Sequence, residues 1–397
     1  MVKALEGVRV LDLSRMYGGP MCTMLLAELG AEVIKVEIPQ GGDGVRNLAP
    51  QTQGLEGYPF VILNRGKQGI TLNLSSEAGR NICKELAGKC DILVENFTPG
   101  VIEGLGLGYE ALKQYNPGLI YASISGFGQT GPSSSQVAFD TIIQAMGGLI
   151  SVNGRPDSPP TKVGPAIADF LGGIYAVVAI LAALQYRSKT NQGQQIDISM
   201  QDCIWAITAI QHLPIYLMTG KEPERLGNSM IEVTPFNIYP AKDGYIVIAI
   251  VTVGQWQRLL EVIGREELKE VPEYGSQLDR IKHIDEIDSL VEEWTRERTV
   301  DEMIRELRAV DLPCAPVPTF SQVANDPQLA SRDMQVEVEQ MISGKLKVPG
   351  SVFKMSETPG DATHPAPFLG QHNAEVYSGL LGYDSETIDK LQREGVI

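Results

Sequence analysis

The first half of the chain alternates short apolar strands with helical segments, and this rhythm constrains the fold more than any other feature. Strands are predicted at 8–13, 32–37, 69–74, 91–96, 119–125 and 194–199. Helical patterns lie between them: Pro20 opens the first, and Ser75-Ser76 start one that runs to about Ala87. Strands separated by helices pair in parallel, because each helix carries the chain back to the end of the sheet at which the previous strand began, in a right-handed crossover. The sequence therefore predicts an α/β fold with a parallel sheet.

A second domain is indicated beyond the charged, glycine- and proline-bearing segment 219–229. Residues 235–250 are predicted to form a β-hairpin with Asp243 and Gly244 in its turn. Amphipathic helices are predicted around 255–263, 284–298 and 300–309, and another hairpin at 334–353. We therefore expect a large Rossmann-like domain from 1–220 plus 326–397, a small α+β domain at 230–317, and linkers at 219–229 and 318–325.

The net charge of −16 limits the partners of this chain. It argues against nucleic acid and against an anionic membrane surface, so any anionic substrate must meet local positive groups. The five cysteines show no metal spacing, and the four histidines leave little material for a metal site. The most apolar segment, 172–185, is too short and too rich in small residues for a membrane span. With no signal peptide pattern at the N-terminus, we expect a cytoplasmic protein without a bound metal.

Asp169 is the most informative single residue. It directly precedes an uncharged run, 170–184, that is predicted to form a buried helix. A carboxylate there faces unpaired N–H groups and the positive end of the helix dipole, so it is expected to stay ionised, as a carboxylate nucleophile must. The alternative is a simple helix cap, which local pattern alone favours by about two to one.

Nucleotide-binding motifs do not explain this parallel sheet. No G-x-G-x-x-G follows the first strand, and the chain holds no Walker motif. The loop GFGQTGP at 126–132 is rich in glycine, but neither a Lys-Ser/Thr pair nor an apolar helix follows it. Dehydrogenase and P-loop functions are therefore disfavoured.

Segments spread over nearly the whole chain resemble the class III CoA-transferases, the family of formyl-CoA and carnitine CoA-transferases. They lie at 5–37, 63–74, 91–110, 121–132, 164–176, 193–202, 312–317 and 364–372. The resemblance implies that Asp169 is a nucleophile that forms an acyl–aspartyl anhydride and then an aspartyl-CoA thioester. Acyl-CoA is then a substrate and no cofactor is permanently bound. The resemblance also implies interlocked ring-shaped dimers, either a homodimer or a heteromer with a related subunit.

The same resemblance implies a set of contacts to coenzyme A, at Met16, Tyr17, Gly18, Leu72 and Asn96. Arg65 and Lys67 lie beside this region and are expected to meet phosphates, with a solvated loop charge as the alternative. The oxyanion of each tetrahedral intermediate needs backbone N–H donors. Gly172, Gly173 or the loop at 126–131 could supply them, although helix packing and turn geometry explain these glycines equally well.

Departures from the family pattern bear on the substrate. Formyl-CoA transferases have an Arg and a Lys where this chain has Gly104 and Val137, and they have a run of four glycines that is missing from 227–237. Formate and oxalate are therefore not predicted. The resemblance favours succinyl-CoA as donor and an aryl- or alkyl-substituted acid, such as benzylsuccinate, as acceptor.

Two other functions compete with transfer. The 2-methylacyl-CoA racemases of the same family carry a His-Asp step where this chain has Phe139 before Asp140, and no histidine lies between residues 1 and 211. A two-base racemase would therefore lack one base. A non-catalytic CoA-binding subunit of a heteromer is the other alternative, and retention of Asp169 argues against it.

Overall fold

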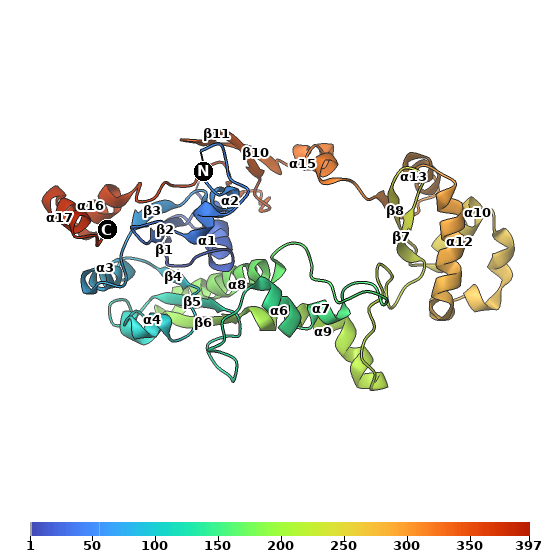
Figure 1. Cartoon of the computed structure of the whole chain (residues 1–397), viewed down its shortest axis with the longest axis horizontal. Coiled ribbons are helices and arrows are strands. Elements are labelled where there is room, and N and C mark those ends of the chain that lie inside the picture. The colour runs from blue at the N-terminus through green and yellow to red at the C-terminus, as the bar shows by residue number, and fades with distance from the viewer. Residues whose placement is uncertain (1, 55) are drawn as a thin grey trace. The chain divides into compact units, whose positions relative to one another are not determined.

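The structure is a computed structural model that describes residues 2–54 and 56–397 (Figure 1). The chain forms two compact units. The large unit contains the chain up to Leu149, Val163–Pro214 and Pro327–Ile397, and the small unit contains Ile150–Lys162 and Ile215–Asp326. The segment Ile150–Lys162, expected in the large domain, joins the small unit because its backbone is bonded there. The Gly227 N–H donates to the Gly154 carbonyl at 2.9 Å, and the Arg225 guanidinium donates to the carbonyl of Ser158 at 2.8 Å.

The large unit is built on a six-stranded sheet in the order β3-β2-β1-β4-β5-β6, and every pairing is parallel. The prediction of a parallel, Rossmann-like α/β sheet is confirmed. The strands are β1 (Arg9–Asp12), β2 (Glu32–Glu37), β3 (Gln68–Thr71), β4 (Ile92–Glu95), β5 (Ile120–Ser125) and β6 (Gln194–Ser199).

Helices cover both faces of this sheet because alternate strand residues point to opposite sides. Val10 packs with α1 and α8 in one core cluster, whereas its neighbour Leu11 packs with α3 and the C-terminal helices in another. The helices that lie mainly in this unit are α1 (Gly18–Glu28), α2 (Tyr58–Asn64), α3 (Glu77–Ala87), α4 (Val101–Gly104), α5 (Tyr109–Leu112), α6 (Asp140–Met146), α8 (Ile167–Thr190), α9 (Met200–Thr219), α15 (Pro327–Ser331), α16 (Asn373–Leu381) and α17 (Ser385–Arg393).

Both predicted hairpins are present. The hairpin of the small unit pairs β7 (Phe236–Pro240) with β8 (Tyr245–Ala249), and β9 (Cys314–Pro316) adds a third strand. The second hairpin pairs β10 (Gln335–Gln340) with β11 (Gly344–Pro349) and packs on α2. The remaining helices are α7 (Leu149–Val152), α10 (Val253–Val262), α11 (Gln277–Arg280), α12 (Ile284–Arg296), α13 (Val300–Arg308) and α14 (Phe320–Val323), with short 3-10 turns at Gly44–Asn47, Glu266–Glu270, Pro272–Tyr274 and Ile281–His283.

Helix α8 differs from the prediction in two ways. It is 24 residues long, so the argument that this segment is too short to span a bilayer is wrong. It is also buried on one face only. Ala176 and Ile180 pack into the core, but Val178 is 59% exposed and Ile174, Tyr175 and Leu181 are exposed as well. Length and composition alone would allow α8 to cross a membrane, but that is weak evidence, because a core helix of a soluble protein meets the same criteria.

Candidate active site

Asp169 lies in the first turn of α8 but does not cap it. The helix begins at Ile167, and the residue at the cap position is Ala166, whose side chain accepts no capping hydrogen bond. Within residues 2–54 and 56–397 the Asp169 carboxylate has no hydrogen-bond donor. The helix-cap alternative is therefore wrong, and the carboxylate is left without a local structural role.

The protonation of Asp169 also differs from the prediction. Burial, and then the negative charge of Asp140, raise its pKa from the ordinary 3.8 to about 7. The sequence predicted a carboxylate kept ionised by the helix N-terminus, but loss of water and a like charge outweigh that effect. Asp169 is therefore poised between its acid and its carboxylate near neutral pH, as is common for reactive groups.

Asp140 is a site residue whose role the sequence analysis missed. It begins α6, and its Oδ1 accepts the N–H of Ala168 in α8 at 2.8 Å. Its Oδ2 accepts from Gln144 at 2.7 Å, and the Gln144 Oε1 in turn accepts the Val163 N–H at 2.9 Å. These bonds fix a second carboxylate beside Asp169. The contact joins residues far apart in sequence, so no local pattern signals it.

The loop after β1 brings two predicted CoA contacts to Asp169. A methyl group added to Gly18 would lie 3.2 Å from the Asp169 carbonyl oxygen and 3.4 Å from its Oδ1. The Tyr17 ring meets the Phe170 ring edge-on at 6.2 Å, and burial and the charge of Asp169 raise the pKa of Tyr17. The first turn of α1 therefore lies against the carboxylate.

Glycines in α8 allow this approach. A Cβ on Gly173 would lie 2.6 Å from the Gly18 carbonyl oxygen, and one on Gly172 would lie 3.0 Å from the Met200 side chain. Both glycines lie inside the helix, where their N–H groups serve the helix ladder. Helix packing therefore explains them, and they are poor candidates for the oxyanion donors. In the 126–131 loop, Gly128 and Gly131 have positive φ, which accounts for glycine there by turn geometry.

The side chains of Asn96, Asp43 and Lys35 fix the loop at 14–16. The Asn96 amide makes two hydrogen bonds to the Arg15 backbone: its Oδ1 accepts the Arg15 N–H and its Nδ2 donates to the Arg15 carbonyl, both at 2.7 Å. Asp43 accepts the Met16 N–H at 3.2 Å, which holds Met16 at a φ of 64°. Lys35 bridges Asp43 and the Ser14 carbonyl. The loop is thus rigid before any ligand arrives.

Other predicted CoA residues have different surroundings. Leu72 is only 1% exposed and packs in the core, and its N–H donates to the Glu37 carbonyl at 2.7 Å. Lys67 is buried and its ammonium contacts Asp12 (3.0 Å), Thr23 (2.7 Å), Asn64 and the Pro20 carbonyl. Arg65 is buried in an ion pair with Glu28. Neither cation is a solvated loop charge, and neither is accessible to a phosphate while these pairs are closed.

The ion pair of Lys67 and Asp12 is fully buried, as is that of Lys35 and Asp43. Burial lowers the pKa of Lys67 to about 8, against the opposing effect of Asp12. Burial would raise the pKa of Asp12, but Lys67 and Lys35 outweigh it and hold that pKa at about 2. Asp12 is therefore firmly ionised, and it also accepts from Ser14 and Thr23.

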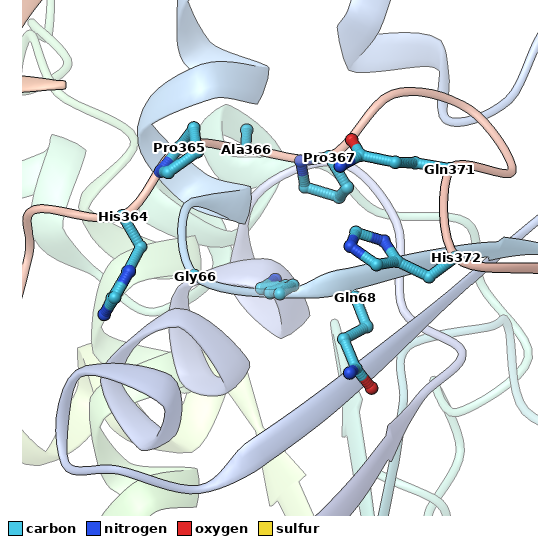
Figure 2. A pocket seen from close by; sticks show the side chains of 9 residues that line it. Gly66, Gln68, His364, Pro365, Ala366, Pro367, Gln371 and His372 are labelled. Carbon is cyan, nitrogen blue, oxygen red and sulfur yellow. The ribbon is translucent and has the colours of Figure 1, made fainter. Parts of the chain in front are cut away.

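A pocket of about 270 Å³ lies where the chain enters β3 (Figure 2). The segment 364–372 arches over it and presents His364 and His372. The His372 N–H donates to the Gly69 carbonyl at 2.9 Å, and its Nδ1 accepts the Gly69 N–H at 3.0 Å. The imidazole thus binds the backbone of β3, which gives this motif a structural role.

Metal ligands and thiols do not form a site in the described part of the chain. Among residues 2–54 and 56–397, no group of three or more His, Cys, Asp and Glu side chains is placed to hold a metal ion. All five cysteines are free, and four are buried.

The fold and site together define a parallel α/β protein with a carboxylate of raised pKa beside the loop that follows its central strand β1. The profile of CoA-transferase family III matches residues 5–373, and the chain belongs to that family. It is therefore a CoA-transferase, which moves CoA between acyl-CoA thioesters and carboxylic acids.

Individual relatives cover the whole chain. It is 37% identical to the succinyl-CoA–D-citramalate CoA-transferase of Chloroflexus aurantiacus, over 100% of this chain and 98% of the relative. It is also 37% identical to the formyl-CoA:oxalate CoA-transferase of Streptomyces avermitilis, over 100% of both. The crystal structure of a CAIB/BAIF family protein from Brucella suis superposes with a TM-score of 0.85, at 35% identity, over 96% of this chain and 100% of that one.

Proposed function

We propose that Asp169 carries the transfer as a covalent nucleophile. Its carboxylate oxygen attacks the thioester carbonyl carbon and the C–S bond breaks. CoA departs as the thiolate, and a mixed anhydride of Asp169 and the donor acid is formed. The thiolate then attacks the Asp169 carbonyl carbon and expels the donor acid, which leaves an aspartyl-CoA thioester. The acceptor carboxylate then attacks the aspartyl-CoA carbonyl carbon, displaces CoA thiolate and forms a second mixed anhydride. The thiolate attacks the acyl carbon of the acceptor in this anhydride, which yields the new acyl-CoA and releases the Asp169 carboxylate. The observation that carries this proposal is a carboxylate without a hydrogen-bond donor, with a pKa of about 7, beside the first turn of α1.

The first turn of α1 supplies the oxyanion donors in this proposal. The N–H groups of Gly18 and Gly19 have no carbonyl partner within the helix, because they lie in its first turn. Gly18 lies against Asp169, so these groups and the helix dipole favour negative charge close to the reacting carbonyl. Gly18 and Gly19 thus replace the glycines of α8 as our candidates for the oxyanion donors.

Coenzyme A binds along the loop after β1 in this proposal, at Met16, Tyr17, Gly18 and Asn96, whereas Leu72 is left out because it is buried. CoA enters and leaves as substrate, and no permanent cofactor is needed because the thioester energy passes through the aspartyl intermediates. Arg65 and Lys67 are left out of this site, because both are in buried ion pairs.

We propose succinyl-CoA as donor and a dicarboxylic acid as acceptor. The relative named for succinyl-CoA and D-citramalate supports this donor, and its acceptor, like the oxalate of the other relative, is a dicarboxylic acid. Benzylsuccinate, an aryl-substituted succinate, belongs to the same chemical class and stays in the proposal. Mass spectrometry of new acyl-CoA products from a panel of these acids, with monocarboxylic acids as controls, tests it. Transfer only to monocarboxylic acids would contradict the acceptor class.

Asp169→Ala tests the nucleophile. This variant should lose transfer and still bind CoA, because the lost group acts covalently and not as packing. Hydroxylamine added during turnover should convert Asp169 of the wild type to a hydroxamate detectable by peptide mass spectrometry. Asp389→Asn, an exposed carboxylate on α17, is the matched control and should keep full activity. Turnover at the wild-type rate in the Ala variant would remove Asp169 from the mechanism.

A second copy of this chain covers the exposed face of α8 in our proposal, as a cytoplasmic homodimer. Ile174, Val178 and Leu181 form an apolar stripe at helical spacing, and Ile210 on α9 is 73% exposed. Such stripes on a soluble protein mark association surfaces. Val178→Glu should yield monomers by light scattering, whereas Val101→Glu on α4 should leave the dimer intact. A monomeric wild type would refute the homodimer, and assembly only with a second protein would indicate a heteromer.

A further inference from the structure

We propose that Arg15 binds the phosphates of coenzyme A, an inference that rests on the proposed function. The protein has a net charge of −16, so a polyanionic ligand needs a local cation. The two cations predicted for that role, Arg65 and Lys67, are committed to buried carboxylates. The positive group must therefore come from elsewhere.

Arg15 is exposed and uncommitted. Within the described residues 2–54 and 56–397, its guanidinium has no carboxylate partner and no hydrogen-bond acceptor. Other arginines of this unit are committed: Arg46 makes two bonds of 2.7 Å to Glu37, and Arg80 donates to the Ser75 carbonyl at 2.8 Å. Lys35 is fully buried. Arg15 is thus the uncommitted cation of the loop that approaches Asp169.

The position of Arg15 is fixed at both ends. Its backbone is bracketed by the Asn96 amide, with both bonds at 2.7 Å, and its guanidinium lies 5.1 Å from the centroid of the Phe97 ring. A guanidinium stacked on a ring keeps its edge donors free, and that fork matches two phosphate oxygens. The stacking also lowers the entropy cost of binding, since the side chain is already oriented.

Arg15 lies a short way along the chain from the residue that packs against Asp169. Arg15 precedes Gly18 by three residues, which span at most about 10 Å, and Gly18 lies against Asp169. In CoA the pantetheine arm separates the thioester from the pyrophosphate, so a phosphate contact belongs beside the reacting carboxylate and not at it. Arg15 is therefore a binding residue with no part in the chemical step.

The test compares a ligand with phosphates and one without. Arg15→Gln should raise KM for succinyl-CoA about tenfold to a hundredfold, as expected for a lost hydrogen bond between charged groups, with little change in kcat. With succinyl-pantetheine, which has no phosphate, Arg15→Gln and the wild type should have the same kcat/KM. Arg15→Lys should recover part of the affinity, and Arg393→Gln, an exposed arginine on α17, should match the wild type with both substrates.

Two results would overturn the inference. One is a KM for succinyl-CoA in Arg15→Gln within twofold of the Arg393→Gln value. The other is an equal loss with succinyl-pantetheine, which would show that the substitution disturbs the loop. Calorimetric titration with CoA and with pantetheine measures the same contact without turnover. A wild type that binds CoA through Arg15 but transfers nothing would refute the proposed reaction and support this inference.

Discussion

Asp140→Asn should shift the pH dependence of the reaction, because the Asp140 charge helps to hold the pKa of Asp169 at about 7. Only the carboxylate form of Asp169 can attack a thioester. With a pKa near 7, about a tenth of it is ionised at pH 6 and about nine tenths at pH 8. The wild-type kcat/KM should therefore rise about tenfold between these two pH values.

Asp140→Asn removes the negative charge near Asp169 but does not change the burial of Asp169. Burial is the larger cause of the raised pKa, so the pKa of Asp169 should fall below 7 without returning to 3.8. The rise in kcat/KM between pH 6 and pH 8 should then be well below tenfold. The asparagine Oδ1 can still accept the Ala168 N–H, so the start of α8 is retained, whereas the bond from Gln144 is lost.

The assay is kcat/KM for succinyl-CoA at a series of pH values and constant ionic strength, since this ratio reports the free enzyme. Asp389→Asn makes the same charge change on α17 and should keep the wild-type profile. Far-UV circular dichroism and thermal melting show whether each variant is folded. A folded, active Asp140→Asn enzyme with the wild-type profile would refute the electrostatic link between the two carboxylates, and a flat wild-type profile would refute the pKa of Asp169.

Two further predictions concern the support of the site. Lys67→Met should lower the free energy of unfolding, measured by urea denaturation, by about 3–5 kcal/mol, because Asp12 is left as an unpaired buried charge. The double variant with Asp12→Asn should regain much of this loss. Equal stability of Lys67→Met and the wild type would contradict the role of this pair. Gly173→Ala should lower the free energy of unfolding by about 1–3 kcal/mol and also lower kcat, because its Cβ would lie 2.6 Å from the Gly18 carbonyl oxygen. Gly379→Ala in α16, where a Cβ has no neighbour within 4 Å, should be neutral or slightly stabilising. Similar melting temperatures for the two variants would show that α1 can move away freely.

Local sequence signals were enough to predict the sheet. Ser76 caps α3 as its position indicated, with its side chain accepting the Gly79 N–H, and the strand β6 was predicted at its observed bounds. Such features depend on residues within one turn or one strand of each other. Connections between neighbouring elements then follow from the right-handed crossover rule.

The charges of the site could not be assigned in this way. Lys67 was predicted to meet phosphates, with a solvated loop charge as the alternative, and only the folded chain brings it to Asp12. The proximity of Asp140 and Asp169 likewise depends on α6 meeting α8. An apolar helix such as α8 presents a related difficulty, because composition alone does not say whether its outer face is covered by its own chain or by another one.

The network that holds the loop after β1 has a consequence for recombination between relatives. The ion pairs Lys67–Asp12 and Lys35–Asp43 are linked through Ser14, which donates to Asp12 and accepts from Lys35, and all five residues lie within the first 67. Asn96, by contrast, reaches the loop from the end of β4. A chimera with a crossover between 17 and 35 would combine a loop from one parent with a buried cation from the other. A crossover between 74 and 91 keeps both ion pairs and the loop from one parent. Of these contacts, only the two hydrogen bonds between Asn96 and the Arg15 backbone then join residues from different parents. Libraries that shuffle substrate preference in this family should therefore place their first junction after β3.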